Sequence, residues 1–204
     1  VTGEPGDFKV TILRHPRYVN EDKCTGCGVC AEHCPIEVPR EFNMELDLRK
    51  AIYVPFPQAI PLVYRIDKEH CINCGLCEHL CGAGAVDHDQ QPATLSVNVG
   101  AIVVTTGFDV YDASKKGEYS YGKYDNIITG LEFERLVNAA GPTGGHIVRS
   151  DGKVPKKIAY IQCVGSRDEK ADNLNCSRVC CMYAIKQAIL IKEHMPETDV
   201  SIFY

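Results

Sequence analysis

Eight of the twelve cysteines form two copies of one spacing, C-x2-C-x2-C-x3-C. Two-cluster ferredoxins use this run, and each motif gives three thiolates to one [4Fe-4S] cube and its fourth thiolate to the other cube. One predicted ligand set is Cys24, Cys27, Cys30 and Cys81. The other is Cys71, Cys74, Cys77 and Cys34. The spacing therefore predicts a protein that carries single electrons.

The residues around these ligands suit a cluster. Gly26, Gly28 and Gly75 lie between ligands, where backbone amides must approach the cluster sulfides closely. Pro35 follows the fourth ligand of the first motif, whereas Gly82 stands at the equivalent place in the second. We expect the fourth cysteine of each motif to begin a helix.

Two other uses of the cysteines fit less well. Zinc sites usually combine paired C-x2-C knuckles into four ligands in all. A disulfide framework requires an oxidising, secreted context, and the sequence shows no signal peptide. Cysteines in cluster spacing instead indicate a reducing compartment, and we expect the cytoplasm.

Composition narrows the class of protein. The chain has 204 residues, of which 45% are hydrophobic and 24% charged, as in ordinary globular proteins. The formal net charge of −5 disfavours nucleic-acid binding. No apolar run approaches the roughly 18 residues of a membrane span. Both ends fall inside expected strands, which suggests a piece of a longer chain.

We expect an α/β protein with three parts. Residues 1–20 form a lead-in with a strand at 8–13, residues 21–90 a two-cluster ferredoxin-like unit, and residues 91–204 an α/β part. Between the two motifs, residues 45–67 are too long for the usual ferredoxin connection and rich in proline. This segment is either an extended lid packed over a cluster or a loop that reaches a second cofactor or partner.

The third part is expected to contain strands, helices and a turn. We expect strands at residues 97–105, 157–162 and 199–204, and helices at residues 129–140 and 178–195. The first helix opens with a capping box, Thr129 and Glu132. Residues 141–146 (GPTGGH) predict a turn rather than a phosphate loop, because no Lys-Ser/Thr follows. The last three of these elements, the strand at 157–162, the helix at 178–195 and the strand at 199–204, predict a parallel βαβ unit.

Four further cysteines fall inside that unit. Cys163 ends a strand, where a dinucleotide-binding unit would begin its glycine-rich loop. Cys176 and Cys180 would share a helix face, with Cys181 beside them. A helix N-terminus favours an anion, and a thiolate-ligated cluster is one. The pattern favours a third [4Fe-4S] cluster, with buried structural thiols or a redox dithiol as the alternatives.

Five segments of the chain resemble the A subunit of heterodisulfide reductase. They are residues 16–19 (PRYV), 56–59 (FPQA), 141–146 (GPTGGH), 162–168 (QCVGSRD) and 176–188 (CSRVCCMYAIKQA). The resemblance runs along the whole chain. It extends to bacterial relatives, including the flavin subunit of the quinone-interacting oxidoreductase of sulfate reducers.

The resemblance implies a thioredoxin-reductase-like flavoprotein fold with an inserted two-cluster ferredoxin. It implies FAD and an extra [4Fe-4S] cluster on four cysteines that match Cys163, Cys176, Cys180 and Cys181. It also implies an oxidoreductase subunit in a hetero-oligomer with the other heterodisulfide-reductase-type subunits. In the methanogen enzyme the FAD bifurcates electron pairs from a hydrogenase or formate dehydrogenase between ferredoxin and the CoM-S-S-CoB heterodisulfide.

Fewer residues point to the flavin. Thr106 and Gly107 resemble a later FAD-contact turn of such flavoproteins, whereas the first FAD-binding βαβ would precede Val1. Lys186 is the candidate for a cation near the flavin, and a solvated helix-face lysine is the alternative. The competing interpretation of the whole chain is a non-catalytic polyferredoxin module. A nicotinamide-dependent reductase is disfavoured by the missing glycines after Ile161.

Overall fold

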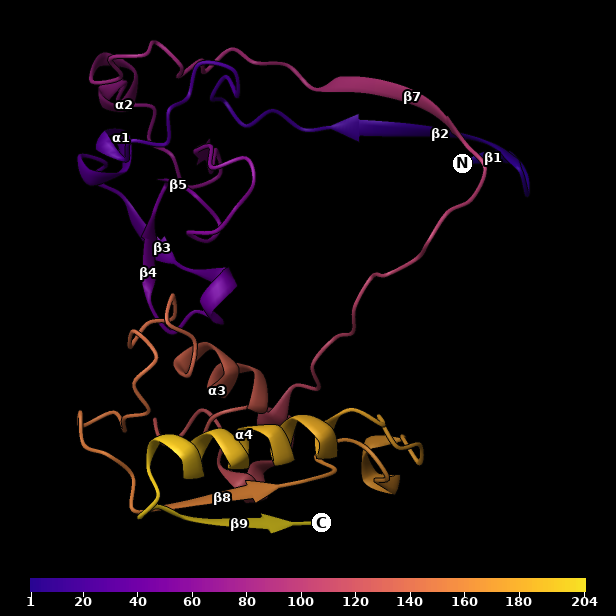
Figure 1. Ribbon diagram of the computed structural model, residues 1–204, viewed down its shortest axis with the longest axis vertical. Coiled ribbons are helices and arrows are strands. Elements are labelled where there is room, and N and C mark those ends of the chain that lie inside the picture. Colours follow the sequence, from indigo (N-terminus) through magenta and orange to yellow (C-terminus); the bar gives the residue numbers. More distant parts are fainter. The chain divides into compact units, whose positions relative to one another are not determined.

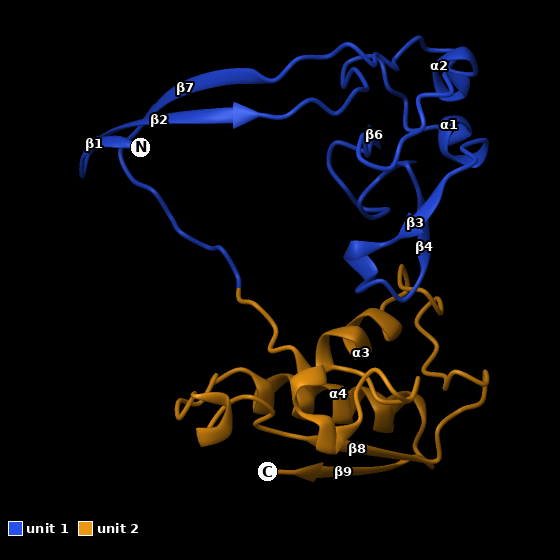
Figure 2. Cartoon of the chain, turned by 180° about the vertical axis from the view of Figure 1, so that it is seen from behind, with its two compact units in different colours: residues 1–107 blue, residues 108–204 orange.

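The computed structural model describes all 204 residues as an α/β chain of two compact units, residues 1–107 and 108–204. Figure 2 distinguishes the two units by colour. Each contains short helices and small sheets, as the sequence predicts. None of the helices is long and apolar enough to cross a bilayer.

A three-stranded antiparallel sheet flanks the two cysteine motifs in sequence. It has the order β1-β2-β7, with bounds Thr2–Glu4, Asp7–Arg14 and Ala93–Val99. In register, Phe8 pairs with Val99 and Arg14 with Ala93, so the segments that enter and leave the cysteine-rich region run side by side (Figure 1). The predicted strand at residues 8–13 is therefore confirmed.

The predicted strand at residues 97–105 is wrong in its position. Strand β7 ends at Val99, and residues 100–112 form no regular strand. The reason lies in the partner strand: β2 begins at Asp7, next to the residue that pairs with Val99, so residues beyond Gly100 have no further strand to pair with. Gly100 closes the ladder by accepting a hydrogen bond from the Gly6 amide at 2.9 Å.

The cysteine-rich region is built from two similar halves. Its regular elements are α1 Val29–Glu32, β3 Glu37–Pro39, the 3-10 turn η1 Glu41–Asn43, β4 Leu48–Lys50, β5 Ile52–Tyr53, β6 Arg65–Ile66 and α2 Leu76–His79. Strand β3 pairs with β4, and β5 with β6, both antiparallel. An isolated bridge between Val19 and Val86 ties the beginning of the first half to the end of the second.

One apolar core supports both halves. Its buried members are Val19, Ile52, Val63, Ile66, Ala85 and Val86. Six of the eight motif cysteines pack against this core, namely Cys24, Cys30, Cys34, Cys71, Cys77 and Cys81. Because both cysteine loops share one core, neither half can fix its loop without the other.

The second unit is an α/β layer around a smaller core. Its elements are η2 Ala113–Lys115, η3 Gly117–Tyr119, α3 Gly130–Leu136, β8 Lys157–Ile161, η4 Glu169–Ala171, α4 Cys180–His194 and β9 Asp199–Phe203. Strands β8 and β9 pair in parallel, with α4 between them in sequence, which confirms the predicted βαβ unit. Phe133, Ile147 and Ile191 form the buried core.

Helix α3 begins as predicted and ends early. Thr129 Oγ1 accepts from the Glu132 amide, and the Glu132 carboxylate accepts from the Thr129 amide, which confirms the capping box. The helix ends at Leu136 rather than at Ala140, and the Thr143 hydroxyl donates to the Leu136 carbonyl at 3.0 Å. That bond satisfies a terminal helix carbonyl, so no further turn is needed.

Residues 141–146 form a turn, as predicted. Gly144 and Gly145 have positive φ angles of 62° and 87°. Gly141 sits so close to the preceding helix that a Cβ atom there would collide with the Arg135 carbonyl oxygen. The glycines therefore allow the chain to turn back tightly against the preceding helix.

Candidate iron-sulfur sites

The two cysteine loops of the first unit have the same backbone path. Each contains a short helix that starts after a left-handed glycine, Gly28 (φ 88°) before α1 and Gly75 (φ 72°) before α2. Gly26 (φ 70°) and Asn73 (φ 53°) occupy the equivalent left-handed position earlier in each loop. Glycine adopts this region freely and asparagine tolerates it, which explains these residue types.

The predicted helix at the fourth cysteine is wrong. The short helices hold the third cysteine of each motif, Cys30 or Cys77, and end before Cys34 or Cys81. Each helix closes a single turn after its left-handed glycine. The fourth cysteine then lies in the segment that leaves the loop, free to face the other half.

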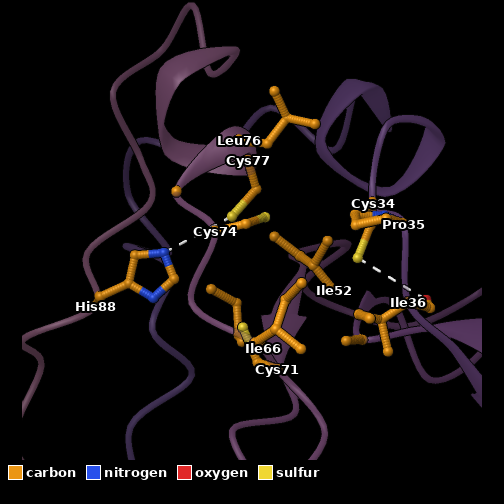
Figure 3. Close-up of a pocket in the computed structure, with 13 residues that line it drawn as sticks. Cys34, Pro35, Ile36, Ile52, Ile66, Cys71, Cys74, Leu76, Cys77 and His88 are labelled. Atoms are coloured by element: carbon orange, nitrogen blue, oxygen red, sulfur yellow. Dashed lines mark hydrogen bonds between the residues drawn. The ribbon is translucent and has the colours of Figure 1, made fainter.

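A cavity in the first unit is lined by four cysteines, Cys34, Cys71, Cys74 and Cys77. This is the ligand set that the crossed ferredoxin spacing predicts. In Figure 3, Cys34 lies on one side of Ile52, and Cys74 and Cys77 lie on the other. The structure therefore brings the fourth cysteine of the first motif to the first three of the second.

Three cysteines of the other predicted set, Cys24, Cys27 and Cys30, lie close enough for their charges to interact. Burial, followed by the charges of the neighbouring Cys24, Cys27 and Cys77, raises the pKa of Cys30 to about 12 against an opposing backbone hydrogen bond. Burial likewise raises the pKa of Cys77, with Cys71 and Cys74 adding to the effect. Thiols crowded in this way cannot all ionise without a compensating positive centre. Iron supplies such a centre.

Cys81 has the opposite environment. Burial alone would raise its pKa, but hydrogen bonds from the backbone amides of residues 83–86 outweigh it, and the pKa of Cys81 is lowered. The Ala85 amide donates to Cys81 Sγ at 3.3 Å. A run of amides directed at one sulfur stabilises a thiolate.

No three Cys, His, Asp or Glu side chains converge closely enough to share a single metal ion. A cubane makes no such demand, because its four thiolates bind four separate iron atoms. The cysteines of this unit thus fit the donor type of a [4Fe-4S] site.

The proline-rich segment between the motifs lies over the first cysteine loop. A Cβ atom at Gly26 would lie 2.9 Å from the Leu62 carbonyl oxygen, and one at Gly28 would lie 3.2 Å from the Tyr64 hydroxyl. The same segment contributes Ile52 and Ile66 to the core and the cavity. These contacts favour the interpretation as a lid over the loop.

Two polar residues that the sequence did not indicate lie near the cysteines of the second loop. His88 lines the cavity, with Nε2 3.7 Å from Cys77 Sγ (Figure 3). Lys68 Nζ lies 2.9 Å from His88 Nδ1. His88 stands eleven residues beyond Cys77 and Lys68 precedes the motif, so only tertiary folding joins them.

In the second unit, the four remaining cysteines also influence one another. The pKa of Cys181 is raised by burial first and then by Cys180, with Cys163 and Cys176 contributing. Burial opposes ionisation of Cys180, but the Ser177 hydroxyl and the backbone amides of Cys163 and Cys181 outweigh it and lower its pKa. Ser177 Oγ lies 3.3 Å from Cys180 Sγ, a contact that the sequence did not indicate.

The predicted start of the long helix in this unit is wrong. Helix α4 begins at Cys180 rather than Arg178, so Cys176 lies in the preceding loop and shares no helix face with Cys180. Arg178 has a φ of 62°, which is incompatible with a right-handed helix. The four thiols are brought together by the loop instead.

That loop repeats a local feature of the second ferredoxin motif. The Arg178 amide donates to Cys176 Sγ at 3.3 Å, as the Asn73 amide donates to Cys71 Sγ at 3.4 Å. Both amide donors are two residues after the cysteine and have positive φ. Cys163 itself has a φ of 60°. Such conformations are costly in a non-glycine residue and concentrate at functional sites.

The candidate flavin residues are less well defined. Gly107 has a φ of 75°, and both it and Thr106 are exposed in an irregular segment. Lys186 Nζ forms an ion pair with Glu134 at 2.8 Å, and Gln187 donates to the same carboxylate at 3.0 Å. The structure thus gives Lys186 a protein partner.

The repeated loops, the shared core and the cysteine-lined cavity define an iron-sulfur protein of the two-cluster ferredoxin type. The family description "4Fe-4S binding domain" matches residues 17–40 and 64–87, which supports [4Fe-4S] clusters on both motifs. Comparison with curated proteins goes further: over its whole length the chain is similar to heterodisulfide reductase A subunits.

Three relatives illustrate this similarity. The chain is 59% identical to the iron-sulfur A subunit of the CoB–CoM heterodisulfide reductase of Methanocaldococcus jannaschii. It is 62% identical to the A subunit of the H2/formate:CoB-CoM heterodisulfide,ferredoxin reductase of Methanococcus maripaludis. It is 48% identical to the A subunit of the ferredoxin:CoB-CoM heterodisulfide reductase of Methanosarcina mazei. Each match covers 100% of this chain, but only 31% of the first two relatives and 26% of the third.

Proposed function

We propose that this chain conducts electrons within an iron-sulfur flavoprotein subunit of a heterodisulfide-reductase-type oxidoreductase. The observation that carries the proposal is the cavity lined jointly by Cys34 and by Cys71, Cys74 and Cys77. A zinc knuckle would take its ligands from paired C-x2-C turns, whereas this crossed set belongs to two-cluster ferredoxins. The sites proposed are therefore two cubanes, with the second set on Cys24, Cys27, Cys30 and Cys81.

A cubane, when bound, exchanges one electron at a time without breaking a bond. The protein contributes the surroundings of the sulfurs. The amides around Cys81 and the helix-turn amides at each loop favour negative charge on the ligands. Cys27 and Cys74 are exposed, so each loop also has a sulfur close to solvent. Electrons can enter or leave where a partner approaches that sulfur.

We propose a third cluster on Cys163, Cys176, Cys180 and Cys181. Support comes from the mutual influence of the four thiols and from the amide-to-sulfur bond at Cys176, which repeats that at Cys71. The N-terminal turn of the 15-residue helix α4 adds the positive end of its dipole. Buried inert thiols would not need these donors.

The remainder of the proposal rests on the family. FAD is proposed for the whole protein, with Thr106, Gly107 and Lys186 as candidate contacts. The flavin exchanges electron pairs and the clusters single electrons, so their combination permits bifurcation. Proposed partners are the other heterodisulfide-reductase-type subunits, ferredoxin, and a hydrogenase or formate dehydrogenase that supplies electrons, as the names of two relatives indicate.

The test is to measure iron, acid-labile sulfide and extractable flavin per chain after anaerobic purification. About twelve iron atoms and about twelve sulfides are expected, four for each cubane. About eight would contradict the third cluster and leave the ferredoxin-type module. Fewer iron atoms than that would contradict the two-cluster assignment. Absence of flavin from the intact protein would favour a plain polyferredoxin module over the flavoprotein subunit.

A further inference from the structure

The two proposed ferredoxin-type sites differ in a side-chain contact to a ligand sulfur. A histidine side chain contacts a ligand sulfur in one of them: His88 Nε2 lies 3.7 Å from Cys77 Sγ. The equivalent place in the first motif, eleven residues after Cys30, is held by Glu41, which pairs instead with Arg49. The repeat is thus broken at this point.

Lys68 decides which nitrogen of His88 carries the proton. Its Nζ lies 2.9 Å from His88 Nδ1. An ammonium group has three donors and no acceptor, so Nδ1 must accept through its lone pair. A neutral imidazole with a free pair on Nδ1 carries its proton on Nε2. That N–H is directed at Cys77 Sγ.

Lys68 is itself held in place by three groups. Besides His88, it donates to Asn73 Oδ1 at 2.9 Å and lies over the Tyr18 ring, 4.8 Å from its centroid. Asn73 is the left-handed residue of the second cysteine loop. One ammonium group therefore fixes both the loop and the imidazole that faces it.

We propose that Lys68 and His88 are positioning residues that raise the reduction potential of the cluster on Cys71, Cys74, Cys77 and Cys34 alone. Reduction adds one electron and no proton to the cluster, and part of the added charge resides on the cysteine sulfurs. An N–H directed at Cys77 Sγ stabilises that charge, since hydrogen bonds to the sulfurs tune such potentials. The Lys68 charge acts in the same direction. This inference rests on the proposed assignment of two clusters.

The test is an EPR-monitored redox titration of the intact, anaerobically purified protein, wild type beside four variants. His88→Phe keeps a ring but removes the donor, whereas His88→Gln keeps both an acceptor for Lys68 and a donor for Cys77. Lys68→Met removes the ammonium that sets the tautomer. His79→Phe is the matched control, because His79 is an exposed histidine of the same half.

In His88→Phe we expect one couple to move to lower potential and the other ferredoxin-type couple to stay unchanged. At fixed potential, the reduced-to-oxidised ratio should fall roughly two- to tenfold, the effect of one hydrogen bond. Tenfold corresponds to about 59 mV for a one-electron couple. Lys68→Met should shift the same couple downward, and His88→Gln and His79→Phe should stay near wild type. Resonance Raman should show an altered Fe–S(Cys) stretch in His88→Phe but not in His79→Phe.

An unchanged pair of couples in His88→Phe with full iron content would overturn the inference. If His88→Phe loses iron, the potentials of Lys68→Met provide the test instead. Unchanged potentials in Lys68→Met would likewise overturn the inference. Equal shifts in His79→Phe would assign the effect to loop disturbance and overturn it as well. A wild-type protein without two low-potential couples contradicts the cluster assignment itself, so the two failures have different signatures.

Discussion

The two units of the chain would assemble their proposed four-cysteine sites in different ways. In the first unit, each motif would supply three ligands from one loop, and Cys34 of the first motif lines a cavity with Cys71, Cys74 and Cys77 of the second. In the second, a strand end provides Cys163, a loop Cys176 and a helix start Cys180 and Cys181. A local spacing therefore reveals the first kind of site, whereas the second kind depends on the path of the chain between distant ligands.

If the two kinds of site are independent, Cys71→Ser has the largest expected effect on the first unit. It removes a ligand that the paired loop cannot replace, so iron should fall from about twelve to about eight atoms per chain. The third site should keep its EPR signal. Loss of all three signals would mean that the units depend on each other for cluster retention. Anaerobic iron analysis with EPR provides the measurement.

Cys180→Ser is the reciprocal change. It removes both the ligand and the partner of the Ser177 contact, so about four irons should be lost from the second unit. Both ferredoxin-type couples should stay at their wild-type potentials. Ser177→Ala is the matched control, since it removes the 3.3 Å contact and leaves all four cysteines in place. Unchanged iron in Cys180→Ser would favour inert thiols at this place.

The contribution of buried ion pairs to the stability of the first unit can be tested at Arg49. Its side chain is 4% exposed and pairs with Glu41 and with Asp67, 2.9 Å away, while it stacks on Tyr53. Arg49→Met leaves the largely buried Asp67 carboxylate without this partner, which should cost about 3 kcal/mol of unfolding free energy. The loss should appear in the chemical denaturation of the first unit alone.

Lys50→Met serves as the control for that change. Lys50 pairs with Glu37 at 2.9 Å, but the two side chains are 31% and 54% exposed. Exposed pairs contribute at most about 1 kcal/mol. Equal destabilisation by both variants would contradict the role assigned to burial.

The smallest expected effect concerns Lys186. Burial would raise the pKa of Glu134, but hydrogen bonds from Lys186 and Gln187 outweigh it, and the pKa is lowered. A carboxylate with a lowered folded-state pKa contributes stability above its unfolded pKa of about 4.3, and loses it as pH falls through the folded value.

Lys186→Met should therefore lower the unfolding free energy of the second unit by about 0.5 kcal/mol at neutral pH. The variant should also lose less unfolding free energy than wild type as the pH falls into the acid range. Chemical denaturation across pH measures both effects. Lys153→Met, which removes an exposed pair with Asp151, is the control. If Lys186 is also the cation near the flavin, the variant should lower the flavin reduction potential in the flavin-loaded protein. Unchanged flavin potential would leave only the ion pair with Glu134.

Short-range spacing and periodicity were enough to predict the eight ferredoxin-type cysteines, the capping box at Thr129 and the parallel βαβ unit. The sequence also grouped the four cysteines of the second unit, but for a wrong local reason, since Arg178 is left-handed and Cys176 precedes the helix. Element ends such as those of β7 and α3 could not be predicted, because they depend on partners elsewhere in the chain.

The surroundings of the sulfurs, by contrast, follow from tertiary folding. The amides of residues 83–86 turn toward Cys81 through a backbone path that no motif specifies. His88, which lines the cavity, and Lys68, twenty residues earlier in the chain, meet with their side-chain nitrogens 2.9 Å apart. The spacing of ligands is a property of a few neighbouring residues. The electrostatic field at a ligand sulfur depends instead on every charged and polar group that folding brings near it.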